Sequence, residues 1–229
     1  MWPRALSPRP DGFPAVVGHR GAKALCPENT LRCLLHAVSL GVDGVEFDVR
    51  TTRDGIPILH HDPDFQRLSG LGARVALVTL RWVRENVRIL GEPVPTLAEA
   101  VEALRGAPVI LLVELKTTGW REAGGILEGL EGRAVVSSFK YRLLEDVSGF
   151  PRVLVSGRRP RRIPDVEGVL IHHSRLDPEY VSELKASGLA VGTWTVDDPG
   201  LALSLGPIDF VVSDDPRRHL ATRGVKPRY

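Results

Sequence analysis

The segment VEFDVRTTRDGIPILHHD, residues 45–62, decides how many strands of this chain can lie in one parallel sheet. Two apolar runs, 44–50 and 56–61, flank a five-residue link that contains the turn pair Asp54-Gly55. A parallel crossover needs about a dozen residues or more, and Asp-Gly is a strong signal for a tight hairpin. We therefore predict one sheet strand followed by a short antiparallel return strand.

Short runs rich in Val, Ile and Leu recur along the rest of the chain, and they are apolar on both faces, as is typical of parallel strands covered by helices. Amphipathic stretches at 28–41, 96–106 and 178–188 lie between such runs, and Thr96 and Glu99 have the spacing of a capping box. With the return strand set aside, eight strand candidates remain: 15–21, 44–50, 108–116, 133–139, 152–157, 168–174, 190–196 and 209–214. This alternation predicts an α/β fold, a (β/α)₈ TIM barrel with a hairpin strand after its second strand; an open doubly wound sheet is the alternative.

The composition predicts one globular unit. The 229 residues are 43% hydrophobic, and no break in composition divides them, so we expect a single domain over residues 1–229. The net charge of +2 gives no case for nucleic acid as a partner, and no apolar run approaches the ~18 residues of a membrane span. We therefore expect no stable membrane insertion, while the oligomeric state stays open.

Two further features suggest where the protein works. The N-terminal segment lacks the apolar core of a signal peptide, and two cysteines, Cys26 and Cys33, are too few for a disulfide framework, which indicates a reducing compartment. We expect a cytoplasmic protein. Scarce Asn, Gln and Met together with many prolines favour a thermophilic source.

Acidic side chains gather where the barrel would place an active site, at the carboxyl ends of its strands. Glu46 and Asp48 are two residues apart on one strand and so share a face. Glu114 and Lys116 are related in the same way at the end of a neighbouring strand candidate. Converging carboxylates repel one another unless a cation lies between them, and oxygen-rich sites suit Mg²⁺, Ca²⁺ or Mn²⁺.

Two histidines can reach this carboxylate group. His19 and Arg20 end the first strand, and the hairpin would bring His61 opposite an acid of the second strand, since cross-strand neighbours lie about 5 Å apart. The histidines could supply a general acid and a general base, and Arg20 and Lys116 add positive charge suited to a phosphate. Each residue alone has a structural interpretation, such as an ordinary salt bridge. Their convergence on one face predicts phosphoester hydrolysis.

The ordered set of motifs resembles the glycerophosphodiester phosphodiesterase family over about residues 15–217. The markers are His19-Arg20-Gly21, Pro27-Glu28-Asn29-Thr30, Glu46-x-Asp48, His61-Asp62, Arg67 with Ser69-Gly70, PTLAEA (95–100), Glu114-x-Lys116, Ser138-Phe139, Trp194-Thr195-Val196-Asp197 and Asp214-x-Pro216. The resemblance implies a TIM-type barrel that hydrolyses a small-molecule glycerophosphodiester to an alcohol and sn-glycerol 3-phosphate, using Mg²⁺ or Ca²⁺, with Mn²⁺ as a further candidate. The roles that it implies are metal binding by Glu46, Asp48 and Glu114, acid–base catalysis by His19 and His61, phosphate contacts by Arg20 and Lys116, and a substrate wall at Trp194.

Several points stay open at this level. The resemblance favours His61 over His60, and strand alternation sends the two side chains to opposite faces, so we interpret His60 as structural. We interpret His172 and His173 as structural too, since neither matches a family position. Four arginines in the loop 157–164 indicate either a solvated loop, which we favour, or a rim that attracts anionic substrates. Which histidine acts first as the base, and whether a cyclic phosphate forms, are not decided by the sequence.

Two other functions compete with glycerophosphodiester hydrolysis. A lysophospholipase D acting on lysolipids would keep the site but would need an apolar groove or lid beside it, and the sequence shows none clearly. A non-catalytic barrel that binds phosphodiesters or sugar phosphates would have no need of both histidines and all three acids. The segment 70–95 is short relative to the family that the chain resembles, which implies a reduced cap and fits a broad specificity.

Overall fold

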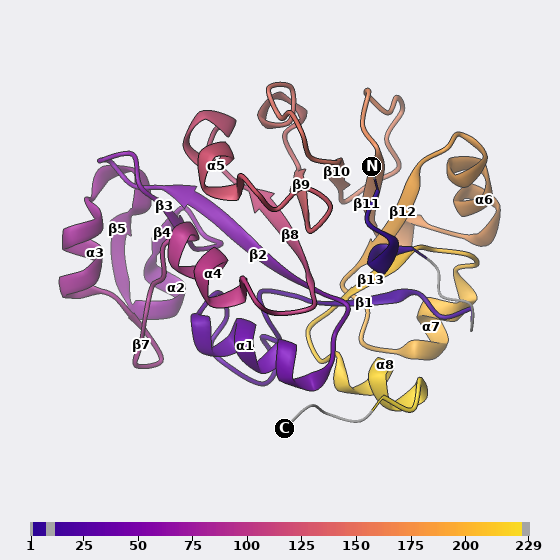
Figure 1. The fold of residues 1–229 in the computed structure, drawn as a ribbon, viewed down its shortest axis with the longest axis horizontal. Helices are drawn as coiled ribbons and strands as arrows, with labels where there is room; N and C mark the ends of the chain where they lie inside the picture. Colours follow the sequence, from indigo (N-terminus) through magenta and orange to yellow (C-terminus); the bar gives the residue numbers. More distant parts are fainter. Residues whose placement is uncertain (1, 8–11, 226–229) are drawn as a thin grey trace.

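The computed structural model describes residues 2–7 and 12–225. Its largest sheet has nine strands in the order β1-β13-β12-β11-β10-β9-β8-β2-β3, and β1 also pairs with β2. All of these strands except β3 pair in parallel and close into a barrel with helices on its outer side (Figure 1). The barrel strands are β1 (Ala15–Gly18), β2 (Gly44–Thr51), β8 (Ile110–Leu115), β9 (Ala134–Ser138), β10 (Arg152–Ser156), β11 (Gly168–His172), β12 (Ala190–Trp194) and β13 (Phe210–Ser213). The closed barrel confirms the predicted fold class and excludes the open doubly wound sheet.

The hairpin that the Asp-Gly pair predicts is present. The return strand β3 (Pro57–Leu59) runs antiparallel to β2 and pairs Leu59 with Val49. Gly55 has a φ of 80°, a conformation that an L side chain rarely adopts and that the turn requires. The hairpin therefore adds one strand to the edge of β2 without entering the barrel.

Helices pack around the barrel, and their ends follow the capping signals. Thr96 caps α4 in a full capping box: its Oγ accepts a hydrogen bond from the Glu99 N–H at 3.2 Å, and its own N–H donates to Glu99 Oε2 at 2.8 Å. Thr30 caps α1, and its Oγ accepts a hydrogen bond from the Cys33 N–H at 3.2 Å. The outer helices are α1 (Leu31–Leu40), α4 (Leu97–Leu104), α5 (Trp120–Leu127), α6 (Pro178–Ala186), α7 (Pro199–Ser204) and α8 (Arg217–Thr222), with short 3₁₀ turns η1 (Arg4–Leu6), η3 (Tyr141–Leu143) and η4 (His173–Arg175). After β9 the chain forms only η3, and after β10 it runs through a loop without a helix.

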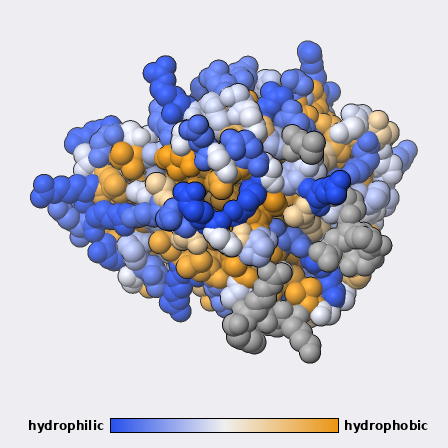
Figure 2. All heavy atoms as spheres, in the orientation of Figure 1, coloured by the Kyte–Doolittle hydropathy of each residue, from blue (hydrophilic) through white to orange (hydrophobic). Residues whose placement is uncertain are grey.

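Two apolar layers hold the barrel. One lies inside it and includes Val17, Leu112 and Phe210, and the other lies between the strands and the helices. Gly192 permits the inner packing, because a Cβ atom there would lie 2.3 Å from the Phe210 ring. The face in Figure 2 carries hydrophilic side chains interleaved with apolar ones. Within the ranges that the structure describes, no helix has the length and apolar character that crossing a membrane requires.

A small lobe follows the hairpin and lies beside the barrel at the left of Figure 1. It has its own apolar cluster, which includes Ile58, Phe65 and Val83. Its elements are β4 (Asp64–Phe65), α2 (Gln66–Ser69), β5 (Leu71–Arg74), η2 (Val75–Leu77), α3 (Leu80–Asn86), β6 (Arg88–Ile89) and β7 (Glu92–Pro93). Packing of the lobe against β2 is consistent with one domain over residues 1–229, which stays a prediction.

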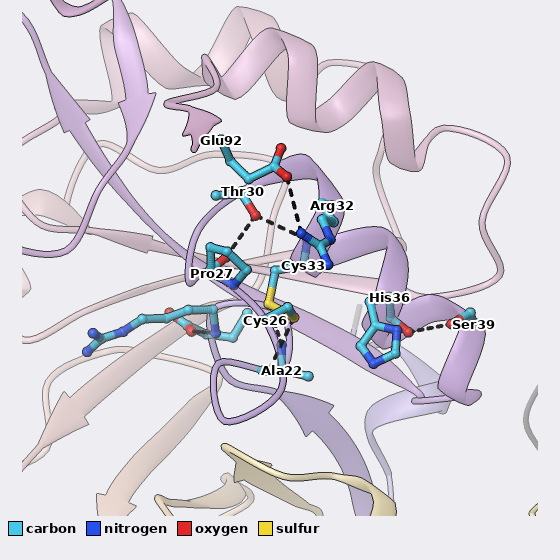
Figure 3. The surroundings of a disulfide bond; sticks show 11 residues. Ala22, Cys26, Pro27, Thr30, Arg32, Cys33, His36, Ser39 and Glu92 are labelled. Carbon is cyan, nitrogen blue, oxygen red and sulfur yellow. Dashed lines mark hydrogen bonds and ion pairs between the residues drawn. A yellow bond between two sulfur atoms is a disulfide. The ribbon is translucent and has the colours of Figure 1, made fainter. Parts of the chain in front are cut away.

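The two cysteines form a disulfide in the loop between β1 and the first turn of α1 (Figure 3). The Cα atoms of Cys26 and Cys33 lie 5.3 Å apart, because the loop folds back on the start of the helix. The N–H of Ala22 donates to Cys33 Sγ at 3.3 Å, which draws the loop further inward. Two cysteines are thus enough for one local crosslink, and they give no support to the predicted reducing compartment.

Candidate active site

The predicted site residues meet at the carboxyl ends of the barrel strands, where an active site belongs in this architecture. A cavity of about 90 Å³ lies there. Its lining residues are His19, Arg20, Glu46, His61, Glu114, Lys116, Phe139, Val155, Leu170, Trp194 and Val212. Of the eight predicted site residues, only Asp48 is missing from the lining. Asp48 contacts Arg20 and Lys116, which line the cavity, and Asn29, which does not.

Three carboxylates form the floor of the site. Glu46 and Asp48 lie on β2 and Glu114 on β8, in a register that pairs Asp48 with Glu114. One oxygen from each residue lies within 4.8 Å of the others. All three side chains are buried, so little water is available to solvate their charges.

Two cations offset part of this negative charge. Arg20 Nε lies 3.1 Å from Asp48 Oδ2, and Lys116 Nζ lies 3.0 Å from Asp48 Oδ1 and also pairs with Glu114. Burial alone would raise the pKa of Asp48, but Lys116 and Arg20 outweigh it and hold that pKa below its usual range. Burial, followed by repulsion from Asp48, raises the pKa of Glu46 well above its usual value and that of Glu114 to about 7. Three carboxylates facing two cations leave an excess of negative charge.

This excess suits a divalent cation. Glu46 Oε1 is buried and has no hydrogen-bond partner among the described residues. An unpartnered buried oxygen is costly unless a ligand satisfies it. The donors are all oxygens, which is the donor set that Mg²⁺ and Ca²⁺ prefer. The buried acidic cluster is therefore compatible with a divalent metal site.

A carboxylate that follows the last barrel strand, β13, holds His19 in place. Its Nδ1 lies 2.5 Å from Oδ1 of Asp214, just after β13, and Lys23 Nζ lies 3.1 Å from the other oxygen of that carboxylate. Its Nε2 lies 3.9 Å from Glu46 Oε2. Burial lowers the pKa of His19 from its usual value, although the hydrogen bond to Asp214 opposes the shift. A neutral ring with its proton on Nδ1 presents an unprotonated Nε2 to the cavity.

His61 has an equivalent carboxylate partner on the other side of the cavity. Its Nδ1 lies 2.7 Å from Asp62 Oδ1, and Arg67 Nε donates to Asp62 Oδ2 at 2.6 Å. Burial lowers the pKa of His61 from its usual value. Both cavity histidines therefore have one ring nitrogen fixed by a carboxylate.

Comparison with known proteins assigns this arrangement to a family. A model of the "Glycerophosphoryl diester phosphodiesterase family" matches residues 19–163, which is more than half of the chain. The chain belongs to this family. A "Probable glycerophosphodiester phosphodiesterase 1" of Mycobacterium tuberculosis is 31% identical over 82% of this chain and 83% of its own length. The "Glycerophosphodiester phosphodiesterase" of Caldanaerobacter subterraneus subsp. tengcongensis is 29% identical over 88% of this chain and 94% of its own length.

A solved phosphodiesterase shares the fold of this family member. It comes from Oleispira antarctica and was determined "in complex with the product sn-glycerol-3-phosphate". The two chains superimpose with a TM-score of 0.83 at 28% identity, over 93% of this chain and 98% of the other. The shared barrel supports the same placement of strands around the cavity.

The glycerophosphodiester phosphodiesterase resemblance selected His61 over His60, and the structure shows how the two residues differ. The expected register is wrong: β3 ends at Leu59, and the N–H of His60, not of His61, donates to the Asp48 carbonyl at 3.0 Å. The His60 ring is fully buried and packs on Phe65, with 4.7 Å between ring centroids. His61 lines the cavity because the chain bends after β3, not because the two strands pair there.

The loop between β1 and α1 supports this phosphodiesterase-family site in ways that sequence reasoning missed. Asn29 Nδ2 donates to Asp48 Oδ2 at 2.9 Å, and the Asp48 N–H donates to Asn29 Oδ1 at 3.1 Å. Glu28 accepts hydrogen bonds from Arg20 at 2.8 Å and from Arg67 at 2.7 Å. The Pro-Glu-Asn-Thr motif was the signal that could have identified these residues. In the sequence this motif marks the family, but it assigns no function to Glu28 or Asn29.

Aromatic rings close the side of the cavity away from the hairpin. The Trp194 ring meets Phe139 and His172 edge-on, at centroid distances of 5.4 and 5.2 Å. Lys116 Nζ lies 5.3 Å from the centroid of the Phe139 ring. His172 also stacks on His173 at 4.4 Å and is fixed by Ser174, so it contributes to the wall rather than to the carboxylate cluster.

Proposed function

We propose that the chain hydrolyses glycerophosphodiesters to an alcohol and sn-glycerol 3-phosphate, with His19 and His61 as an acid–base pair. One observation carries the proposal: two histidines, each held by a carboxylate at Nδ1, line the same small cavity as two acids of a buried three-carboxylate cluster. The product bound to the Oleispira antarctica relative supports the same substrate class here.

In this proposal Glu46, Asp48 and Glu114 hold the divalent metal. Mg²⁺ and Ca²⁺ are the leading candidates, with Mn²⁺ as a further one, because all the donors are carboxylate oxygens. A cation bound there supplies electrostatic stabilisation of the charge that develops on the phosphoryl oxygens.

The histidines move the protons. Burial lowers the pKa of both rings, which keeps a neutral imidazole available at neutral pH to accept a proton from the nucleophile, either water or a glycerol hydroxyl whose cyclic phosphate product water then opens. The partner histidine, once protonated, donates to the oxygen of the leaving alcohol. Asp214 and Asp62 hold the two rings in orientation through Nδ1 and stabilise the imidazolium forms.

Arg20 and Lys116 bind the phosphate in this proposal. Both line the cavity, and both are already oriented by acids: Arg20 by Glu28 and Asp48, and Lys116 by Asp48 and Glu114. A fixed cation loses little freedom when the phosphate arrives, so its charge is well placed for the dianionic transition state. Trp194 forms the wall against which the glycerol or the headgroup lies.

A release assay tests the proposed activity. Purified protein is incubated with glycerophosphocholine or glycerophosphoethanolamine in the presence of Mg²⁺, Ca²⁺ or Mn²⁺, and sn-glycerol 3-phosphate is measured. We expect product with at least one metal, loss of product with EDTA, and loss in His19→Ala and His61→Ala. His36→Ala, a change on the outer helix α1, is the matched control and should retain activity. Absence of product with every metal would refute the proposal.

The same assay separates the competing functions. A lysophospholipase D would release more choline from lysophosphatidylcholine than from glycerophosphocholine, and choline is therefore measured as well, because lysophosphatidylcholine yields lysophosphatidic acid rather than sn-glycerol 3-phosphate. A non-catalytic barrel would bind the diester without cleaving it, and the histidine substitutions would leave that binding unchanged.

A further inference from the structure

A second hollow adjoins the catalytic cavity. Its volume is about 760 Å³, compared with about 90 Å³ for the catalytic cavity. Phe139 and Val155 line both, so the two spaces share a wall at the ends of β9 and β10. The larger hollow is also lined by four arginines of the loop after β10: Arg158, Arg159, Arg161 and Arg162.

We propose that this arginine-lined hollow binds a second phosphate, carried on the headgroup of the substrate. The preferred substrates are then glycerophosphodiesters whose headgroup has a phosphoryl group of its own. This inference rests on the proposed function, and it assigns a specificity role to a loop that the catalytic chemistry does not use.

Among the described residues, three of the four arginines have no acidic partner. Arg159 pairs with Asp177, and its guanidinium lies 4.4 Å from the centroid of the Tyr180 ring, so it is held in place and largely neutralised. In the part of the chain that the structure describes, no carboxylate lies within ion-pair distance of Arg158, Arg161 or Arg162. Their charges are therefore available to an anion.

The nearest acids do not cancel this charge. Asp165 and Glu183 line an adjoining hollow together with Arg161 and Arg162. Asp165, however, is paired with Arg152 at 3.0 Å. Even with Glu183 counted, the loop keeps an excess of positive charge.

The local fold keeps the arginines at the rim. Ser156 Oγ donates to the carbonyl of Arg158 at 2.7 Å and accepts from its N–H at 3.3 Å, which bends the chain as β10 ends. No helix follows this bend before β11, so the loop leaves the carboxyl end of the barrel beside the catalytic residues and returns directly to the amino end, where Asp165 pairs with Arg152 at the start of β10.

The small size of the catalytic cavity leaves the headgroup free to contact a second region. A space of about 90 Å³ leaves the headgroup to extend beyond it. Lys116 lies over Phe139, so a headgroup leaving the phosphate site past Phe139 enters the arginine-lined hollow. Arginine forms charge-assisted, often bidentate, hydrogen bonds with phosphate. Because these arginines are exposed, their contribution is modest and sensitive to salt.

Two substrates that differ by one glycerophosphoryl group, and hence by one negative charge, test the inference. Glycerophosphoglycerol has an uncharged headgroup, and bis(glycerophospho)glycerol has the same headgroup with a second phosphate diester. After correction for the two equivalent ends of the larger molecule, we expect its kcat/KM to be about tenfold higher at low salt. The ratio should fall towards unity at about 0.5 M NaCl, where exposed charges are screened.

The variant Arg161→Gln/Arg162→Gln should abolish this preference and leave kcat/KM for glycerophosphoglycerol within about twofold of the wild type. Arg121→Gln, on the outer helix α5, is the matched control and should retain the preference. Equal kcat/KM values for the two substrates in the wild type, or a preference that survives the double substitution, would overturn the inference while leaving the proposed function intact. Failure to cleave either substrate would remove the proposed function and this inference with it.

Discussion

The Nδ1 atom of His19 lies 2.5 Å from Oδ1 of Asp214, although the two residues are 195 positions apart in the sequence. His19 follows β1 and Asp214 follows β13, and these strands pair in parallel where the barrel closes. Closure of the barrel therefore also assembles the histidine–carboxylate pair. The carboxylate fixes the ring so that Nε2 can face the cavity, which links the fold directly to the chemistry.

Asp214→Asn should reduce kcat by about tenfold to a hundredfold, because His19 loses its orienting carboxylate. Asp214 raises the pKa of His19, so its loss should move the limb of the kcat/KM profile that reports His19 to lower pH, whichever histidine acts first as the base. The profile is measured with a small glycerophosphodiester over pH 5–9. Asp215→Asn, whose native carboxylate pairs with Arg217 instead, is the matched control. Equal effects of the two substitutions would contradict a positioning role for Asp214.

Metal-free protein should lose stability as the pH rises through about 7, because the pKa of Glu114 is raised from 4.5 to about 7 in the folded state. A raised carboxyl pKa means that the folded state binds the proton more tightly than the unfolded state, so this stabilisation is present at low pH and lost above the folded pKa. His19 and His61, with lowered pKa values, contribute the opposite slope. Comparison with Glu114→Gln therefore isolates the Glu114 contribution.

The measurement is thermal unfolding with EDTA and with Mg²⁺ or Ca²⁺ at pH 6 and pH 8. We expect the metal-induced rise in Tm to be larger at pH 8, since Glu114 must lose its proton to bind a cation. Glu145→Gln, an exposed position, should behave as the wild type does. A metal effect that is the same at both pH values would count against Glu114 as a ligand.

Asn29→Ala should destabilise the protein by about 1–3 kcal/mol, because it removes both hydrogen bonds to the buried Asp48. It should also weaken metal binding, since Asp48 loses the groups that orient it. Urea unfolding and metal titration measure the two effects. The other asparagine of the chain, Asn86, is exposed and donates only to a helix carbonyl, so Asn86→Ala serves as the control. Similar losses in both variants would show that Asn29 has no special role.

Reduction of the Cys26–Cys33 disulfide should lower the free energy of unfolding by about 2 kcal/mol, since the crosslink closes a short loop of the unfolded chain. Chemical unfolding with and without dithiothreitol measures the change. The variant Cys26→Ala/Cys33→Ala should not respond to the reductant. A wild type that is equally stable in both conditions would show that the crosslink does not constrain this loop.

The barrel was predictable from the sequence because its signals are local. Asp54-Gly55 marks the hairpin, and the apolar runs are too short for helices and number eight once the return strand is set aside, which favours a barrel over an open sheet. The eight site residues could also be selected from the sequence. For example, strand alternation alone places Glu46 and Asp48 on one face. Cytoplasmic location and a thermophilic source stay predictions from composition.

Contacts between distant segments could not be predicted from local sequence signals. Nothing local in the sequence pairs Asp214 with His19, because barrel closure brings them together. The hairpin register was misread because β3 ends two residues before His61, and a bend, rather than strand pairing, directs that ring into the cavity. The number of cysteines does not predict the disulfide, because the path of the loop brings the two sulfur atoms together.

The most direct test of the central claim is the position of Mn²⁺ in crystals grown with Mn²⁺ and sn-glycerol 3-phosphate, located by its anomalous scattering. We predict one strong peak bounded by carboxylate oxygens of Glu46, Asp48 and Glu114, with the phosphate beside Arg20 and Lys116 and both His19 and His61 in reach of it. An active, metal-dependent protein whose only Mn²⁺ peak lies elsewhere would contradict the account.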